Sequence, residues 1–400
     1  MSLRPPAASL DRLLASREIV VAGGPGGVGK TTTAAALAAM ASVRANAKIL
    51  VVTVDPARRL ADALGVDGIG NAATRVPREA FAAAGAQPRG ALFAAMLDTK
   101  QSWDTFVKRQ APDATTAERI LSNPIYQNIS GRFAQGHEYI AMERLYEIHA
   151  EGEYDLVVVD TPPTREALDF LDAPRRMAEF FASRLLRWLV APARSRLVSL
   201  ASRPFYQVAD RVLGTQFLED VGEFFLLFQS MYEGFVARAR AVGALLRDEA
   251  TTFMVVTTLE AVPAHEATRF VAALAERRLH LGLLVANKVL PASLADPEAA
   301  VVADALRARS AETASRLAGA LARRSGELDQ VSRVLEEIGR SFSNFELVAS
   351  RQAELLAEMA QAHEVTATVP HLPGEVTGLA DLLEVGRRLF SAPGGRGQRA

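Results

Sequence analysis

One stretch near the amino terminus restricts the possible folds severely: Gly24-Pro25-Gly26-Gly27-Val28-Gly29-Lys30-Thr31, which fits the phosphate-binding pattern G-x-x-x-x-G-K-[ST]. The β-branched run at 19–22 indicates a buried strand before it, and the alanine-rich run from Thr32 indicates a helix after it. Glycines let backbone N–H groups wrap around phosphates, and the helix points its positive end at them. A glycine-rich turn without a ligand is the alternative. The strand-loop-helix order favours a loop that binds a nucleoside triphosphate.

Residue chemistry suggests a role for each polar side chain of this loop. Lys30 would reach the β- and γ-phosphates, and the Thr31 hydroxyl would complete a Mg²⁺ shell. Lysine is scarce in the rest of the chain, so Lys30 stands out. The residues predicted to contact the nucleotide here are Gly24, Gly26, Gly27, Val28, Gly29, Lys30, Thr31 and Thr32.

Further apolar runs predict a sheet around the loop. Two strands flanking a helix make a βαβ unit, which implies a parallel sheet covered on both faces. The additional strand candidates are 48–55, 91–98, 154–160, 252–258, 281–287 and 364–370. We therefore predict an α/β fold with a mostly parallel, doubly wound sheet and helices on both faces.

Helical patterns interrupt this core twice, which predicts a helical insertion subdomain. The boundaries assign 17–98, 154–170 and 251–390 to a discontinuous ATPase core, 99–153 and 171–250 to the helical subdomain, and 391–400 to a disordered tail.

Two aspartates follow apolar strands, where ligands bind in open parallel sheets. Phosphoryl transfer needs one carboxylate near Mg²⁺ and another to hold the attacking water. Asp160 fits the first role and Asp55 the second. The alternative is that each aspartate simply caps the next helix.

Composition excludes several classes of function. A net charge of −1 argues against nucleic-acid binding. The absence of cysteine excludes disulfides, zinc-thiolate sites and thiol catalysis. Residues 1–17 lack the long apolar run of a signal peptide, and no window reaches the ~18 apolar residues of a membrane span. We expect a cytoplasmic protein.

Four segments together resemble the ArsA family of P-loop (SIMIBI-class) ATPases: 26–32, 55–60, 160–164 and 370–376. This family comprises arsenite-pump ATPases and cytosolic ATPases that target tail-anchored membrane proteins. The matches extend from residue 19 to about 390. The phosphate loop alone is also shared with MinD and ParA relatives, so the other segments make the resemblance specific.

The resemblance implies roles for individual residues. Asp55 lies in the segment that matches switch I and would orient the attacking water, so it is expected to be catalytic together with Lys30. Asp160 lies in switch II. Asn287 would contact adenine, and Pro370 would pack near the base. Glu260 would contact nucleotide across a dimer interface.

Three departures from the family pattern matter. The family's second loop lysine, which reaches the partner subunit's phosphates, is replaced by Pro25. Arg58, Arg59, Arg165 or a lysine of a paralogous partner would have to replace it. Without cysteine, neither the family's dimer-bridging CxxC zinc site nor its arsenite-binding cysteines can exist.

Two apolar stripes in the second helical block have two interpretations. The stripes run over 177–189 and 217–235, and the latter includes Phe224 and Phe228. In the targeting ATPases, such segments form a groove for a client transmembrane helix. Between Arg175 and Arg211, eight arginines against two acidic residues give a local charge of +6, which suits a membrane surface or the flank of a client. The alternative is ordinary core packing with a solvated arginine face.

The leading hypothesis is a cytosolic, Mg²⁺-dependent ATPase that works as a dimer. ATP-driven closing would reshape a client-binding region for hydrophobic or membrane-protein segments. The alternative is a nucleotide-gated regulatory subunit that needs a lysine-bearing paralogue. Large helical insertions argue against a MinD-like positioning ATPase, and missing cysteines argue against an arsenite pump subunit.

Overall fold

The computed structural model describes residues 10–54, 59–66, 68–129, 134–161, 179, 220, 223–228, 230–321, 328–360, 365–372 and 374–391. They form an eight-stranded sheet in the order β3-β4-β2-β5-β1-β6-β7-β8, in which only the β3–β4 pair is antiparallel. The strands are β1 (Ile19–Gly23), β2 (Lys48–Thr53), β3 (Thr74–Arg75), β4 (Ala91–Met96), β5 (Leu156–Asp160), β6 (Thr251–Thr258), β7 (Leu281–Val289) and β8 (Val365–Pro370). The prediction of a mostly parallel α/β sheet is confirmed.

The central strands are buried along their whole length because both faces of the sheet are covered. Every residue of β1, β5 and β6 is buried. Strand β1 lies between β5 and β6, with Ala22 opposite Asp160. The loop that leaves β1 therefore emerges at the middle of the sheet, between the carboxyl ends of its two neighbours.

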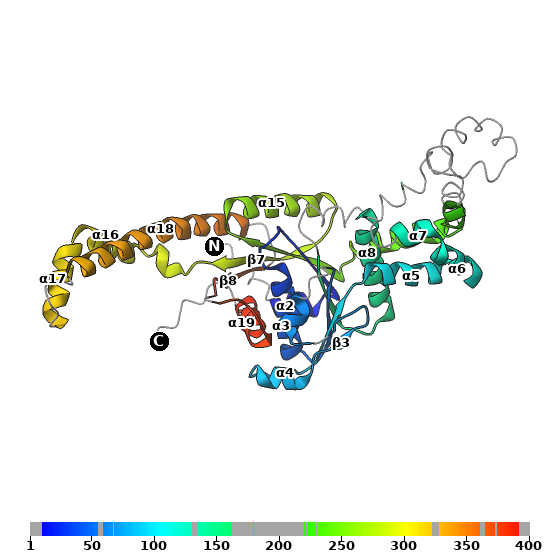
Figure 1. Cartoon of the computed structure of the whole chain (residues 1–400), viewed down its shortest axis with the longest axis horizontal. Coiled ribbons are helices and arrows are strands. Elements are labelled where there is room, and N and C mark those ends of the chain that lie inside the picture. Colours follow the sequence, from blue (N-terminus) through cyan, green and yellow to red (C-terminus); the bar gives the residue numbers. More distant parts are fainter. Residues whose placement is uncertain are drawn as a thin grey trace, which may run out of the picture.

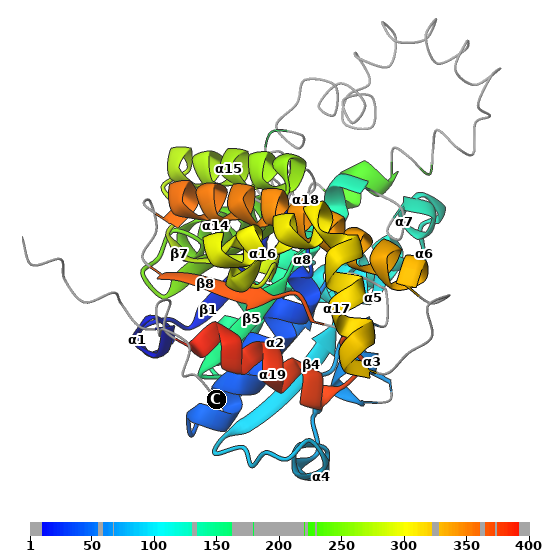
Figure 2. The same ribbon diagram turned by 90° about the vertical axis from the view of Figure 1, so that its left-hand side faces the viewer.

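Helices pack on both faces, as a doubly wound sheet requires (Figure 2). One face carries α1 (Leu10–Ala15), α2 (Lys30–Arg44), α3 (Arg59–Leu64), α4 (Arg78–Ala83) and α19 (Leu379–Phe390). The other face carries α8 (Ala134–Glu151), α14 (Tyr232–Leu245) and α15 (Ala261–Glu276). Among the described residues, every helix is too short or too polar to cross a membrane.

A helical subdomain extends from one end of the sheet (Figure 1). It contains α5 (Thr99–Gln110), α6 (Ala114–Ser122), α7 (Pro124–Ile129), the segment 223–228 and the first turns of α14. Phe224, Phe228, Met231 and Phe235 are buried there against Trp103 and its neighbours. These members of the 217–235 stripe form an ordinary core, as the second interpretation predicts. The 177–189 stripe lies outside the described residues.

A second extension, which we call the arm, lies between β7 and β8 and projects from the opposite end of the sheet (Figure 1). It consists of a 3₁₀ turn η1 (Ala292–Ala295), α16 (Pro297–Ala308), α17 (Ser310–Leu321) and the 33-residue α18 (Leu328–Ala360). The predicted ATPase core, 251–390, includes this whole segment. The apolar pattern of 295–362 indicates helices but does not indicate that they project from the sheet.

Candidate functional site

The loop between β1 and α2 has the backbone that phosphate binding needs. Gly24, Gly27 and Gly29 have φ values of +145°, +75° and +89°, which side-chain-bearing residues rarely adopt. A Cβ atom at Gly24 would lie 2.0 Å from the Val256 carbonyl oxygen, so this glycine is also required by the neighbouring strand. Gly26 and Gly27 are exposed, whereas Pro25 and Val28 are buried. The exposed glycines leave the outer rim of the loop open to a ligand.

Lys30 occupies the first turn of α2 and curls back over the loop. Its Nζ donates to the Pro25 carbonyl oxygen at 2.8 Å, and the residue is only 8% exposed. Because α2 begins at Lys30, the N-terminal amides of this helix, including that of Thr32, immediately follow the loop. A nearly buried ammonium group beside a helix N-terminus makes the loop strongly attractive to anions.

Asp160 ends β5 and faces the same helix. Its Oδ2 accepts hydrogen bonds from the Thr31 hydroxyl at 2.7 Å and from the Thr53 hydroxyl at 2.9 Å. The carboxylate is 1% exposed. Thr53 and Asp160 are directly paired in the register of β2 and β5, so the sheet itself brings these groups together. The structure thus joins the two side chains that the sequence assigns to Mg²⁺, Thr31 and Asp160, in one hydrogen-bonded group.

Asn287 approaches the loop from β7. Its Nδ2 donates to the Val28 carbonyl oxygen at 2.8 Å, and a Cβ atom at Gly29 would lie 2.4 Å from that nitrogen. The contact explains why Gly29 must lack a side chain. Asn287 therefore lies beside the loop, and its predicted contact with adenine stays a prediction.

Lys288 is a basic residue of this site that sequence reasoning missed. It adopts φ +56°, and its exposed Nζ donates to the Gly27 carbonyl oxygen at 3.4 Å. Its backbone N–H donates to Oδ1 of Asn287, which helps to hold this turn. The only signals in the sequence were its position after Asn287 and the scarcity of lysine.

The remaining predicted residues are less closely grouped. Glu260 is exposed and precedes the first turn of α15, after β6. Pro370 ends β8 and is paired with Val289 of β7. Asp55, Arg58 and Arg165 lie outside the described residues. Their predicted roles stay predictions, as does the role of Arg59 at the start of α3.

The family model for anion-transporting ATPases, ArsA_ATPase, matches residues 17–319, which is most of the chain. The chain belongs to the ArsA ATPase family. Members of this family are P-loop ATP hydrolases, and the chain is an ATP hydrolase of this type. The matched residues include the loop, Asp160 and Asn287, whereas all of α18, β8 and α19 lie beyond them.

Three relatives show the range of this ATPase's similarity. It is 26% identical to "ATPase get3" of Schizosaccharomyces japonicus over 72% of this chain and 81% of that one. It is 24% identical to "ATPase ASNA1 homolog" of Entamoeba dispar, over 73% and 82%. It is also 24% identical to "Putative arsenical pump-driving ATPase 2" of Aquifex aeolicus, over 67% and 79%.

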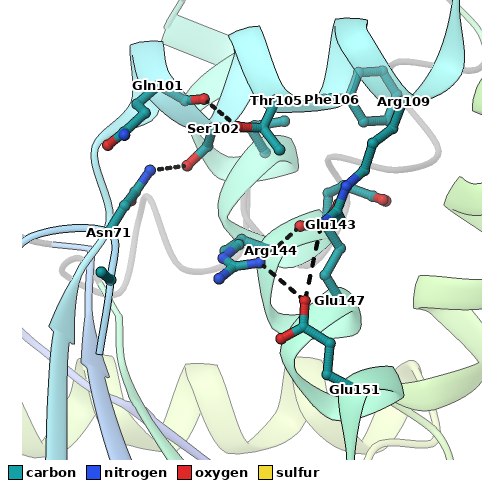
Figure 3. A pocket seen from close by; sticks show the side chains of 12 residues that line it. Asn71, Gln101, Ser102, Thr105, Phe106, Arg109, Glu143, Arg144, Glu147 and Glu151 are labelled. Atoms are coloured by element: carbon teal, nitrogen blue, oxygen red, sulfur yellow. Dashed lines mark hydrogen bonds and ion pairs between the residues drawn. The ribbon is translucent and has the colours of Figure 1, made fainter. Parts of the chain in front are cut away.

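Apart from the phosphate loop, the ATPase has a cavity between the turn at Asn71 and the helices α5 and α8 (Figure 3). This cavity of about 270 Å³ is lined by α5, α8 and the turn at Asn71, and by no residue of the phosphate loop. Arg144 lies 3.0 Å from Glu147 and 3.6 Å from Glu151, while Arg109 lies 2.6 Å from Glu147. Because its arginines are already paired with glutamates, this cavity is a poor site for a triphosphate.

Proposed function

We propose that this chain binds MgATP at the 24–31 loop and hydrolyses it in the cytoplasm. The observation that carries the proposal is the group formed by Thr31, Asp160 and Thr53 beside the nearly buried ammonium of Lys30. Lys30 and the α2 amides would bind the phosphates. The sheet register fixes the carboxylate before any ligand arrives, so little reorganisation is needed on binding.

The donor set fits Mg²⁺. This ion takes oxygen ligands and usually relies on one or two protein side chains plus phosphate oxygens. Thr31 and Asp160 supply a hydroxyl and a carboxylate at the buried side of the loop. Bound there, the ion would neutralise negative charge on the phosphates as it develops during transfer.

We assign the orientation of the attacking water to Asp55. Strand β2 ends at Thr53, and the Val54 N–H donates to the Asp160 carbonyl oxygen at 3.2 Å. Val54, the residue before Asp55 in the sequence, is therefore hydrogen-bonded to the backbone of Asp160, a residue of the proposed Mg²⁺ site. Asp55→Asn should abolish hydrolysis while ATP binding is retained, whereas Lys30→Ala should weaken both.

Lys288 is proposed to supply, within one chain, a cation that Pro25 cannot supply. Its Nζ already lies against the loop at Gly27, so it would contact phosphate oxygens with a small change of rotamer. Lys288→Ala should raise the KM for ATP several-fold. Lys108→Ala, which removes an exposed lysine of α5, is the matched control and should leave the KM unchanged.

Two helices shared by the sheet and the helical subdomain support the proposal that the nucleotide site is coupled to a hydrophobic client. In α8, Ile140 packs in the subdomain core while Leu145 packs on the sheet. In α14, Phe235 packs in the subdomain core while Val242 packs on the sheet. Since α8 leads directly into β5 and Asp160, a movement at the nucleotide would tilt the subdomain. We propose that this movement accompanies closure of a dimer and handling of a membrane-protein segment.

The client proposal needs a test that spares the subdomain core. Phe224 and Phe228 are buried, so charged residues there would unfold the subdomain. Trp188→Asp in the 177–189 stripe is the better variant, with wild-type melting and ATP hydrolysis as controls. Co-purification of single-span membrane proteins should fall in this variant. An unchanged yield would contradict the assignment of client binding to that stripe.

A regulatory subunit that requires a lysine-bearing paralogue is the second candidate, and Pro25 is the observation that favours it. ATP hydrolysis by the purified protein distinguishes the two candidate functions. Purified protein alone should hydrolyse ATP in a Lys30-dependent manner. If it binds ATP but stays inert until a paralogue is added, the regulatory reading replaces the first one.

A further inference from the structure

The arm exposes an unusual number of large apolar side chains. On α18, Val334 is 52% exposed, Ile338 51%, Phe345 52% and Val348 45%. Leu347, on a different side of the helix, is 57% exposed. Almost all the large apolar side chains that are exposed in the described part of the chain lie on α16, α17 or α18. Such a concentration in one extension indicates a surface that is covered by something.

The face of α18 that is already covered is fixed by its contacts. A Cβ atom at Gly339 would lie 2.6 Å from the Ala303 carbonyl oxygen, which shows how closely α16 and α18 approach. Ser332 donates to Ser310 at 3.1 Å, at the start of α17. The contact face therefore includes small and polar residues together with the buried Ala349. It differs from the exposed apolar stripe.

The exposed stripe has the spacing of a coiled-coil seam. Val334, Ile338, Ser341, Phe345 and Val348 follow one another at steps of four, three, four and three residues. This is the 3.5-residue repeat that keeps one helix in contact with another along its length. The stripe is about 21 Å long at 1.5 Å per residue. It lies on the part of α18 that projects beyond the sheet (Figures 1 and 2).

We propose that this stripe, Val334–Val348, pairs with the same stripe of a second copy in antiparallel orientation. Glu337, Asn344 and Arg351 follow one another at steps of seven along one flank, and all three are exposed. A two-fold axis at Asn344 places Glu337 opposite Arg351 of the second copy, and the reverse pair forms as well. A symmetric contact of this kind requires a self-complementary surface, and this flank has one.

Parallel pairing has no comparable charge match. In a parallel pair, the residues facing Glu337 and Arg351 would come from the other flank of the stripe, where Leu335, Phe342 and Ala349 are apolar. A lipid surface is also disfavoured, because membrane-binding helices have basic residues beside the apolar face. Here the flank contains both signs of charge.

The first test is the oligomeric state of the full chain without nucleotide, by sedimentation over a range of concentrations. Phe345→Glu should raise the dimer dissociation constant at least tenfold. Leu347→Glu is the matched control, since it adds the same charge at an equally exposed apolar position outside the stripe. It should change the constant less than twofold. Both variants should retain wild-type helicity and ATP hydrolysis.

The second test fixes the orientation. Glu337→Arg and Arg351→Glu should each weaken the dimer, and the double reversal should restore it. Because the chain has no cysteine, Asn344→Cys introduces a single thiol. In the antiparallel dimer this thiol should form an intermolecular disulfide on mild oxidation, whereas that of Val334→Cys should not. Cross-linking through residue 334 instead would overturn the antiparallel orientation.

Three results would overturn the proposal as a whole. The first is a wild-type chain that remains monomeric at every concentration. The second is a dimer that Phe345→Glu leaves intact, which would place the contact elsewhere. Vesicle binding by a monomeric wild type that is lost in Phe345→Glu would also overturn it, and would assign the stripe to a membrane.

Discussion

The helical subdomain and the arm extend from the same sheet, yet they place their apolar side chains differently. In the subdomain, Trp103, Phe106 and Phe235 are buried, and the Phe106 and Phe235 rings meet edge to face at 5.5 Å. On the arm, Ile338 and Phe345 are about half exposed. The first extension has a core of its own, whereas the second presents an apolar stripe at its surface.

Chain connectivity explains this difference. The subdomain brings together helices from two distant segments, so that several apolar faces converge. The arm is one continuous segment between β7 and β8, and α18 packs mainly on α16, α17 and η1. A long helix packed on one side leaves another side for a partner. Both extensions are helical, so helix content alone does not distinguish a structural insertion from an interaction surface. The exposure of the apolar side chains does distinguish them.

The largest expected effect is the loss of a subdomain aromatic. Phe235→Ala should lower the free energy of unfolding by about 3–5 kcal/mol, because it empties a packed aromatic cluster. Phe345→Ala on the arm should lower it by less than about 1 kcal/mol, since that ring is already half exposed. Denaturant titration of both variants measures the contrast. Equal losses would show that the arm has a core of the same kind.

A buried ion pair should give the next largest difference. Arg238 lies 2.7 Å from Glu143, whose side chain is 2% exposed, and its guanidinium stacks 4.6 Å from the Tyr146 ring centre. Arg238→Met should cost about 3 kcal/mol, because it removes the cation that this buried carboxylate faces. Arg340→Met removes an exposed pair with Glu336 on the arm and should cost at most about 0.5 kcal/mol.

Stability measured at acidic pH is a control for the Arg238→Met prediction. If Arg238→Met acts by leaving a negative charge buried, protonation of Glu143 should relieve part of the loss. The stability gap between wild type and Arg238→Met should therefore narrow as the pH falls. A gap independent of pH would indicate that the arginine acts mainly through packing on Tyr146.

Short local sequence patterns are enough to predict the phosphate loop and the aspartate beside it. The loop glycines, Lys30 and the strand-ending Asp160 follow from strand, loop and helix signals within a few residues of each other. Asn287 required the resemblance to a family, since nothing in its own segment indicates that it reaches Val28. Lys288 reaches the loop only through a turn at φ +56°, and no sequence signal predicts that conformation.

The arm escaped prediction for a physical reason. Its inner face includes the small or polar residues Ser332, Gly339 and Ser343 as well as the buried Ala349. Its exposed side contains Val334, Ile338 and Phe345. The exposed stripe therefore continues the apolar side of α18, and the pattern of apolar residues alone does not show how much of that side other helices cover. The two-residue β3 is missed for a simpler reason, its length.

Two glycine-to-alanine substitutions, one on the arm and one in α14, test the comparison between the two extensions with smaller expected effects. Gly339→Ala should destabilise the arm by about 1–3 kcal/mol, because the new methyl group meets the α16 backbone at 2.6 Å. Gly243→Ala in α14 should stabilise the protein by up to about 1 kcal/mol, since the nearest atom is the mobile end of Arg247 at 3.4 Å. Hydrogen exchange should show faster opening of α16 and α18 in Gly339→Ala only. Unchanged exchange there would contradict the close approach of the two helices.

The smallest effect concerns the start of α6 in the subdomain. The backbone N–H of Thr116 donates to Asp113 at 2.7 Å, and its hydroxyl donates at 3.0 Å. These hydrogen bonds, the backbone one foremost, hold the pKa of Asp113 below its ordinary value. The folded state therefore stabilises the charged form of Asp113. The contribution of this cap to the free energy of unfolding is complete at pH values above the ordinary pKa of about 4. It is lost as the pH falls through the lowered folded value.

Asp113→Asn isolates this contribution, because asparagine caps a helix without titrating. At neutral pH the wild type should be slightly more stable than the variant, and the two should converge in acid. Carboxyl chemical shifts in a pH titration measure the folded pKa directly. A midpoint at the ordinary value, with parallel stability curves for both proteins, would show that the α6 cap contributes no charge-dependent stability and that the subdomain depends on its aromatic core instead.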